Sequence, residues 1–448
     1  MNRISPFDRS RNTLKVPLMI SRRIPRIIKA RLRPSSCDLK AIYGIGDPTP
    51  RGHLKILNGP RYALLSYVTM PFRMPLDHPL NLHFSNVGIA RNTVRALNEL
   101  GYIADVVEWT DVNFLPQREY DLFIGHGGWN YEHIARMLPH ATKIYLSTGM
   151  YWKEHNMREA QRFLSLQQRR GVGLPYDRWI SRDEEYANQI ADGIISLGGE
   201  AARESYSGFP LVVNMNVAAY HDDRYDHTTK DFAGGRNKFL FFSGPGNVHK
   251  GLDLLLETFS IVSAHLYVCQ EIRRDFSAIY RHELEDYSNI HVLGTVPLRS
   301  QQFYELTDLC DFAIHPSCAE GQPGSVVECM HQGLIPVVSR ETNIDTDEFG
   351  ITLMDCSIEE IGKVVNNLSQ RSPEWCEAMS RRTRKAALAE FSEDAFLRNM
   401  KAAIERIISE RAGVANVPAF WVDSFSEVGG TSRSTDVSAF EKSHQHIV

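Results

Sequence analysis

The sequence lacks the apolar segments that mark membrane-spanning and secreted proteins. No apolar run approaches the ~18–20 residues that a helix needs to cross a bilayer, and the N-terminus has no apolar signal-peptide core. The formal net charge is only -4, which gives no reason to expect a polyanionic partner. We therefore expect a cytoplasmic protein whose main ligand is not a nucleic acid.

Cysteine is scarce, and no two cysteines form a recognisable pair. The seven cysteines include no C-x-x-C motif, and most lie in apolar segments, as Cys310 and Cys329 do. This pattern indicates a reducing compartment and no structural zinc.

A strong excess of one charge occurs in one place, the N-terminus. Residues 1–36 carry ten Lys and Arg against a single acid, Asp8. Pro25 can open a short amphipathic helix over 24–34, with Leu32 and isoleucines on one side and basic residues opposite. Such a helix can lie on an anionic membrane surface, although a solvated tail or an Arg-rich transit peptide has the same composition.

The length predicts two domains, because 448 residues are too many for one hydrophobic core. Short apolar runs alternate with helix-length polar stretches in two series along the chain, which is typical of parallel sheets in an α/β fold. A polar stretch that ends in Gly-Gly separates the series, as a linker would. The predicted division is a basic extension (1–60), a first Rossmann-like domain (61–216), a linker (217–237), a second domain (238–411) and a disordered tail (412–448).

Two glutamates in the second series raise the question of a binding site. Glu320 follows an apolar strand, and Glu328 lies eight positions later at the start of a predicted helix, after a turn from Gly321 to Gly324. Ser325 and Glu328 have the S-x-x-E spacing of a helix capping box, which needs no ligand.

The same turn also predicts an anion site. A helix that starts at the carboxyl end of a parallel strand presents free N–H groups to the crevice. A carboxylate on either side can accept hydrogen bonds from two hydroxyl groups. Glu320 and Glu328 therefore suit the hexose and the ribose of a nucleotide sugar, with the diphosphate between them.

A second glycine-rich turn opens the same domain, in FLFFSGPGNVHKG. Gly244 and Gly246 let the backbone approach a ligand, and Lys250 adds a cation just before a helix. The turn matches neither a dinucleotide fingerprint, which needs glycine in place of His249, nor a P-loop, which needs G-K-[ST]. A tight turn with a solvated lysine explains it equally well.

Together these motifs resemble the family 4 glycosyltransferases, which have the GT-B fold of two doubly wound, Rossmann-like α/β domains facing each other across a cleft. The resemblance covers about residues 238–370. It rests on the spacing of Glu320 and Glu328, on Lys250-Gly251, on the strand VLGTV at 292–296 and on GLIPVV at 333–338.

The resemblance implies a role for each matching residue. Glu328 would bind the ribose hydroxyl groups, Glu320 the transferred sugar and Lys250 the diphosphate. The other donor-binding residues would be the turn glycines, a position near the base and the start of the helix: Gly244, Gly246, Val296, Gly324, Ser325 and Val326. Transfer would proceed with retention and without an obligatory metal or a cofactor, since cations and helix-end amides stabilise the leaving diphosphate.

His126 is the contribution expected from the first domain. It ends a strand and precedes two glycines, which places its imidazole at the rim of the crevice. Family members often have a histidine there, so His126 would join Lys250 and Glu320 as a catalytic residue that orients the sugar or moves a proton. A histidine at a turn is more often structural. The aromatic and polar stretch 147–155 suits an acceptor groove or simple packing.

One position departs from the family pattern. Family members commonly have arginine where this sequence has Pro245, so half of the cationic clasp on the diphosphate is missing. His249 or Arg340 could take its place; otherwise the protein is weak or inactive. Asp345-x-Asp347 resembles the metal motif of a different glycosyltransferase architecture, and we expect no metal site there.

The sequence thus predicts a metal-independent, retaining glycosyltransferase that moves a sugar from a nucleotide-sugar donor to a hydroxyl acceptor. The basic N-terminus favours an acceptor in surface polysaccharide or glycolipid synthesis and peripheral contact with a membrane. Two alternatives stay open. One is an inactive paralogue that binds sugar or nucleotide, motivated by Pro245, and the other is a sugar-nucleotide epimerase on the same fold.

Overall fold

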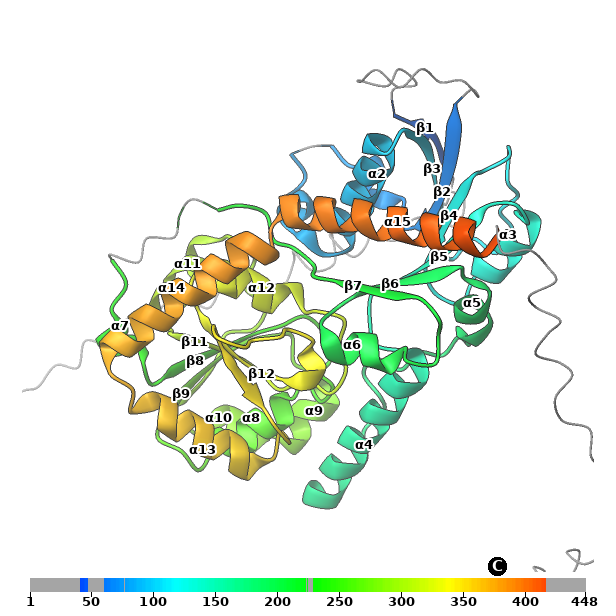
Figure 1. Ribbon diagram of the computed structural model, residues 1–448. Helices are drawn as coiled ribbons and strands as arrows, with labels where there is room; N and C mark the ends of the chain where they lie inside the picture. Colours follow the sequence, from blue (N-terminus) through cyan, green and yellow to red (C-terminus); the bar gives the residue numbers. More distant parts are fainter. Residues whose placement is uncertain (1–40, 47–59, 76, 223, 225–228, 416–448) are drawn as a thin grey trace, which may run out of the picture.

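The computed structural model describes residues 41–46, 60–75, 77–222, 224 and 229–415, which form two α/β units (Figure 1). Each unit is built on one sheet, of seven strands in the first and six in the second. The basic segment 1–36 with its predicted helix, and the tail from residue 416, lie outside the described residues.

The first sheet is parallel except at one edge. Its strand order is β1-β3-β2-β4-β5-β6-β7, and β1 pairs antiparallel with β3. The central strands β4 and β6 are buried along their whole length, as continuous apolar runs predict for a sheet covered on both faces. The strands are Ile42–Ile45 (β1), Arg61–Tyr67 (β2), Tyr102–Glu108 (β3), Leu122–Gly125 (β4), Thr142–Ser147 (β5), Gly193–Leu197 (β6) and Val212–Met215 (β7).

The helices of the first unit follow its strands. They are η1 (Met70–Phe72), η2 (Pro79–Leu82), η3 (Phe84–Gly88), α2 (Ile89–Glu99), α3 (Tyr131–Met137), α4 (Trp152–Arg170), α5 (Glu185–Ile190) and α6 (Glu200–Ser205). Helix α2 shows the expected pattern, because its Val94 and Leu97 share one face and are buried in the core of this unit.

The second sheet is parallel throughout its described strands. Its order is β10-β9-β8-β11-β12-β13, so β8 and β11 are neighbours although 69 residues separate the end of β8 from the start of β11 in sequence numbering, residues 243–311. The strands are Lys238–Phe242 (β8), His265–Cys269 (β9), Ile290–Val292 (β10), Phe312–His315 (β11), Ile335–Ser339 (β12) and Ile351–Leu353 (β13). Because parallel neighbours end at the same edge, the loops after β8 and β11 meet there.

The helices of the second half of the chain pack around this sheet, except for the last. They are α7 (Phe232–Gly235), α8 (Leu252–Phe259), α9 (Arg274–Ile279), α10 (Arg281–Glu285), α11 (Gln301–Leu309), α12 (Gly324–His331), η4 (Arg340–Thr342), α13 (Ile358–Ser369), α14 (Pro373–Glu390) and α15 (Glu393–Ala415).

Two long helices tie the units together. Helix α4 belongs in sequence to the first unit, but its Phe163 and Leu166 lie in the core of the second, and Arg169 pairs with Asp253 at 2.5 Å. Helix α15 returns in the other direction and packs along α2, β5 and β7 (Figure 1). The predicted domain boundary at residue 411 counts this helix with the second domain, whereas most of its contacts are with the first.

The predicted fold class, two Rossmann-like α/β domains, is confirmed by these sheets. Within the described ranges, no helix is both long enough and apolar enough to cross a membrane.

Candidate functional site

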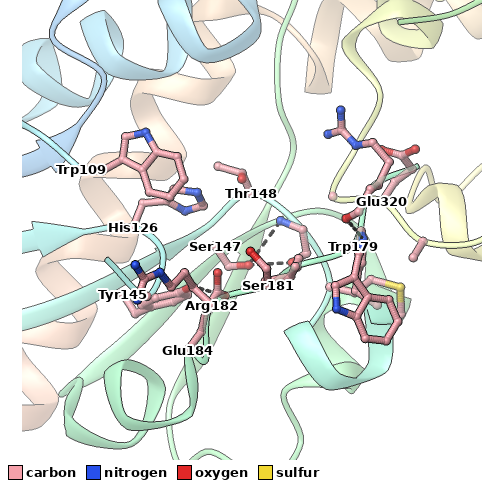
Figure 2. Close-up of a pocket in the computed structure, with 18 of the residues that line it drawn as sticks. Trp109, His126, Tyr145, Ser147, Thr148, Trp179, Ser181, Arg182, Glu184 and Glu320 are labelled. Atoms are coloured by element: carbon pink, nitrogen blue, oxygen red, sulfur yellow. Dashed lines mark hydrogen bonds between the residues drawn. The ribbon is translucent and has the colours of Figure 1, made fainter. Parts of the chain in front are cut away.

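A cavity of about 300 Å³ lies between the two units, at the carboxyl ends of their parallel strands. The first unit lines it with residues that follow β3, β4 and β5, including part of the stretch 147–155, and with the irregular segment 178–184. The second unit lines it with the loops after β8 and β11. Figure 2 shows Trp109 and His126 on one side of the cavity and Glu320 on the other. This is the edge at which open α/β sheets bind ligands.

A close approach of two backbones sets the position of the Glu320 loop. A Cβ added to Gly321 would lie 2.3 Å from the carbonyl oxygen of Thr148 and 2.6 Å from that of Leu197, so only glycine fits without a shift. The side chain of Gln322 adds hydrogen bonds across the same junction. The second unit is therefore seated directly on the ends of β5 and β6.

His126 lies just after β4, as predicted, and lines the cavity. Its Nδ1 is 2.9 Å from the carbonyl oxygen of Leu146, and because a carbonyl can only accept, Nδ1 carries the proton and Nε2 keeps a lone pair. The rings of Trp109 and Tyr67 pack against it, with centroids 5.2 and 5.4 Å away. Burial lowers the pKa of His126. The cavity thus faces a neutral imidazole of fixed tautomer that can accept a hydrogen bond or a proton.

The structure brings Glu320 and Lys250 into direct contact. Lys250 Nζ donates to Glu320 Oε1, and Ser317 Oγ donates to the same oxygen at 2.8 Å. Burial by itself raises the pKa of Glu320, but the charge of Lys250 and the neighbouring histidines more than offset it, so the pKa lies well below its ordinary value. An ionised carboxylate and an ammonium therefore lie together at the edge of the cavity.

The glycine turn after β8 lies beside this pair, but part of its backbone is already used. Asp177 Oδ2 accepts hydrogen bonds from the amides of Val248 (2.8 Å) and His249 (3.0 Å). Gly246 has a φ of +114°, a conformation that favours glycine. At Gly244 an added Cβ would meet no atom within 4 Å, so a ligand can approach the turn from that side.

Arg178 is a cation near this turn that the sequence did not reveal. It lines the cavity, and a Cβ added to Gly246 would lie 3.4 Å from Arg178 Cγ. Burial lowers the pKa of Lys250, and the nearby charge of Arg178 lowers it further. The Arg178 guanidinium makes no hydrogen bond or ion pair with the residues that the structure describes. Arg340, in contrast, pairs with Glu204 and does not line the cavity, so it does not replace the missing arginine.

Glu328 lies in α12 and is buried outside the cavity lining. The helix begins at Gly324 with Pro323 as its N-cap, which makes no side-chain hydrogen bond, so the capping-box interpretation is wrong. Arg299 Nη2 donates to Glu328 Oε2 at 3.3 Å, while Oε1 is buried without a partner among the described atoms. Burial raises the pKa of Glu328 to about 7, and Arg299 opposes this rise. A buried acceptor without a partner suits a hydroxyl ligand.

The remaining predicted donor residues are divided between a helix start and the core. The first amides of α12, at Gly324 and Ser325, have no partner within the helix, as at any helix start. The N–H of Val326 donates to Pro323 at 3.0 Å, and its side chain is buried in the core. Val296 is buried in a separate apolar cluster of the second unit. The site roles of these residues stay predictions.

The first unit adds polar groups that the sequence did not single out. Tyr145 donates a hydrogen bond to Glu184 Oε2 at 2.5 Å, and burial raises the pKa of Glu184 to about 7. The Arg182 guanidinium lies over the ring of Trp129 at 3.9 Å (Figure 2 shows Arg182 and Glu184). A carboxyl group with a pKa near neutrality in a cavity is a candidate acid or base. The only sign of Arg182 and Glu184 in the sequence was the high content of aromatic and charged residues in the loop that carries them, 178–184.

Part of the chain matches a known protein family, and the fold resembles that of solved structures. Residues 236–369 match the family described as glycosyl transferases group 1. Among solved structures, sucrose-phosphate synthase from Thermosynechococcus elongatus is similar with a TM-score of 0.54 at 13% identity, covering 78% of this chain and 100% of that one.

Two further structures have a TM-score of 0.46. One is WaaG, a glycosyltransferase involved in lipopolysaccharide biosynthesis, at 13% identity over 76% of this chain and 98% of that one. The other is Anabaena HepE in complex with UDP and glucose, at 12% identity over 78% of this chain and 99% of that one. No curated protein sequence matches the chain. The similarity to sucrose-phosphate synthase shows the fold: the chain has the GT-B fold, and its residues 236–369 match the glycosyl transferases group 1 family.

Proposed function

We propose that the protein transfers a sugar, with retention, from a nucleotide-sugar donor to a hydroxyl acceptor in the cavity between its two units. One observation carries the proposal. His126 of the first unit and Glu320 of the second line the same cavity, Lys250 contacts Glu320, and the charge of Arg178, which also lines the cavity, acts on Lys250. A sugar between the imidazole and the carboxylate would have its diphosphate next to the cations.

The donor would bind mainly along the second unit, with Arg178 added from the first. Its diphosphate would lie against Lys250, Arg178 and the first amides of α12 at Gly324–Ser325, because cations and helix-start N–H groups favour an anion. A ribose hydroxyl would donate to the unpartnered Oε1 of Glu328. The base would lie near Val296.

The chemistry would be mainly electrostatic. Cleavage of the glycosidic bond creates an oxocarbenium-like centre and places negative charge on the leaving diphosphate, where one well-placed donor is worth about 3 kcal/mol. Glu320 would accept a hydrogen bond from the transferred sugar, and His126 Nε2 from a sugar or acceptor hydroxyl. The departing phosphate oxygen would take the acceptor proton, so the acceptor attacks on the face that the diphosphate leaves, which gives retention. No step of this scheme uses a metal ion.

The acceptor would bind the wall that the first unit supplies. Tyr145, Glu184 and the nearby tryptophans Trp109 and Trp129 offer hydroxyl-binding and stacking groups there. We propose an acceptor in surface polysaccharide or glycolipid synthesis, with the basic segment 1–36 as a peripheral membrane contact. That segment lies outside the described residues, so its role rests on sequence alone.

Nucleotide binding tests the donor site first. Calorimetric titration with UDP, GDP and ADP should show selective binding of one nucleotide, and Lys250→Ala should abolish it. Lys385→Ala, which changes an exposed lysine on α14, is the matched control and should bind as the wild type does. If the folded protein binds none of the three nucleotides, the result supports the inactive paralogue instead.

Turnover separates the enzymatic alternatives. With the donor that matches the bound nucleotide, release of the nucleotide should require an acceptor, and the anomeric configuration of the product should equal that of the donor by NMR. Interconversion of the free nucleotide sugar without an acceptor would support the epimerase. A product of opposite configuration would exclude retention.

A further inference from the structure

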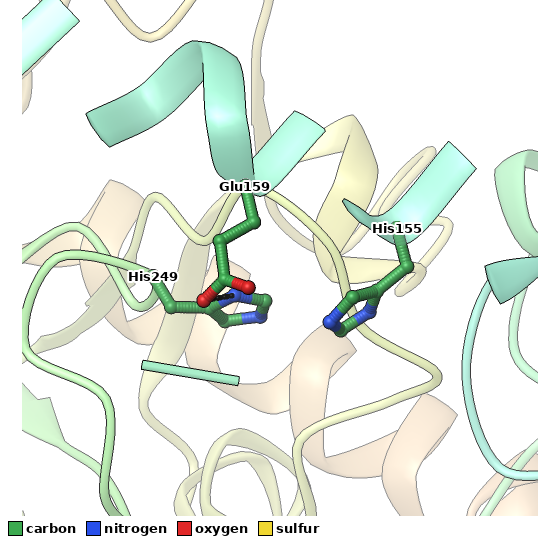
Figure 3. Close-up of side chains that lie close together, drawn as sticks. All are labelled: His155, Glu159 and His249. Atoms are coloured by element: carbon green, nitrogen blue, oxygen red, sulfur yellow. Dashed lines mark hydrogen bonds and ion pairs between the residues drawn. The ribbon is translucent and has the colours of Figure 1, made fainter. Parts of the chain in front are cut away.

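Three buried side chains from the two units converge at the wall of the cavity, which His155 and His249 help to line (Figure 3). His155 and Glu159 lie one turn apart on α4, and His249 lies in the loop after β8. One potential ligand atom from each residue lies within 4.8 Å of the other two. The carboxylate of Glu159 lies against the His249 ring, and the His155 ring stands beside them, with the two ring centroids 5.0 Å apart. Imidazole nitrogens and carboxylate oxygens are ligands that Zn²⁺ accepts.

Cys318 is the candidate for a fourth ligand: it lies next to His249, although its Sγ is not among the ligand atoms that all lie within 4.8 Å of one another. Its Sγ is 3.6 Å from His249 Nδ1, and Glu159 Oε1 is 3.3 Å from the same nitrogen. In a tetrahedral site with Zn–N and Zn–O of about 2.0–2.1 Å and Zn–S of about 2.3 Å, a nitrogen lies about 3.3 Å from an oxygen ligand and about 3.6 Å from a sulfur ligand. The separation between Cys318 Sγ and His249 Nδ1 fits two ligands of one zinc ion, whereas Glu159 Oε1 is hydrogen-bonded to His249 and leaves Oε2 as the oxygen that can bind the ion.

Outer contacts orient two of these groups as metal ligands are usually oriented. His249 Nε2 is 2.5 Å from the carbonyl oxygen of Ala319, so Nε2 carries the hydrogen and Nδ1 is left to bind a metal. Glu159 Oε1 accepts hydrogen bonds from the amides of Asp177 (3.0 Å) and Arg178 (2.6 Å). Glu159 Oε2 is buried and has no partner in the described part of the chain, which is costly unless a cation or a donor satisfies it.

We infer that His155, Glu159, His249 and Cys318 form a structural Zn²⁺ site. The absence of paired cysteines indicated no structural zinc, but the fold assembles a mixed set of ligands from α4 and from the loops after β8 and β11. The ion fastens the first unit to the two loops that carry Lys250 and Glu320. The inference does not depend on the proposed function, because metal binding has its own readout, although His249 Nε2 lies 3.6 Å from Glu320 Oε1.

The test uses the purified full chain, stripped of metal with a chelator and then titrated with Zn²⁺ or Co²⁺. We expect one ion per chain to stay bound through gel filtration and to raise the midpoint of thermal unfolding. With Co²⁺ we expect the visible absorption of a tetrahedral site together with a thiolate-to-metal band, because Cys318 is a ligand.

Variants locate the ion. Cys318→Ala and His155→Ala should each weaken Zn²⁺ binding at least about 10–100-fold, the loss that follows removal of even an outer partner. Cys318→Ala should also remove the thiolate band, and Cys318→Ser gives the same information if the alanine variant does not fold. Two controls should bind as the wild type does: Cys269→Ala, in another buried cluster, and His133→Ala, exposed on α3.

Two results would overturn the inference. One is a folded wild-type chain that retains no stoichiometric ion, and the other is an ion held equally well by the Cys318 and His155 variants. The cluster would then be a buried imidazolium–carboxylate pair of His249 and Glu159. Nucleotide titration of the same samples shows independently whether the donor site works.

Discussion

Glu328 allows a sharp test, because the same carboxylate should lower stability and promote nucleotide binding. Burial raises its pKa in the folded protein to about 7, from an ordinary value of 4.5. A group whose pKa is raised by folding stabilises the fold fully below the unfolded pKa, and this contribution is lost as the pH rises through the folded pKa. At about 1.4 kcal/mol for each pH unit between the two values, the loss reaches about 3 kcal/mol above pH 7.

Glu328→Gln removes this titration and keeps an oxygen that can accept from Arg299. We expect the variant and the wild type to be equally stable near the unfolded pKa, and the variant to be more stable by up to about 3 kcal/mol at alkaline pH. Urea unfolding followed by circular dichroism at a series of pH values measures the difference. Glu390→Gln, an exposed residue at the end of α14, is the control and should stay within about 0.5 kcal/mol of the wild type throughout.

The same substitution should weaken binding of the selected nucleotide at least about 10-fold, because an amide forms weaker hydrogen bonds with ribose hydroxyl groups than a carboxylate does. If the free energies of unfolding of the variant and the wild type change with pH in the same way, the reasoning from a buried charge is refuted. A normal affinity in a variant that gained stability would refute the ribose role alone.

Three other predictions concern the cavity. Arg178→Ala should weaken binding of a nucleoside diphosphate about 10–100-fold and of the monophosphate less, whereas Arg182→Ala should not; equal losses for both phosphates would contradict a diphosphate contact. His126→Asn should lower kcat about 100-fold with unchanged donor affinity, and a pure loss of affinity would exclude the proposed role in catalysis. Gly321→Ala should lower the free energy of unfolding by about 1–3 kcal/mol, because the new Cβ meets backbone carbonyls of the first unit. Gly173→Ala, whose new Cβ meets no atom within 4 Å, should lower the free energy of unfolding less. Equal losses for the two variants would show that the junction between the units accommodates the extra methyl group without strain.

The sheets could be predicted from sequence because a parallel strand buried on both faces is a short continuous apolar run. KFLFF, HLYVC and FAIH form β8, β9 and β11, and a helix does begin in the turn after Glu320. The local prediction about Ser325 and Glu328 failed for a reason that spacing does not reveal. Pro323 holds the cap position, and Glu328 turns instead to Arg299, a partner 29 residues earlier in the chain.

Arg178 and Glu184 could not be predicted, because they lie in a segment without periodicity. Tertiary contacts fix this segment: Asp177 accepts from the loop after β8, and Glu159 accepts from the amides of Asp177 and Arg178. The sequence of a loop does not show which groups its charged residues contact in the folded protein. The same limit applies to α15. Its sequence shows an apolar face, but it does not show which of the two units that face packs against.

The position of Arg178 changes what Pro245 implies. A chain without the usual arginine in its second unit need not be inactive, because the stem of Arg178 from the first unit packs near the same turn and its charge acts on Lys250. Asp177, the residue before Arg178, is hydrogen-bonded to the loop that carries Lys250, so the two cations are held together by contacts that cross the units. A diphosphate bound by both cations would itself link the units. Separating the units would remove one of the charges that stabilise the leaving group, so stabilisation of the transition state would depend on the closed arrangement.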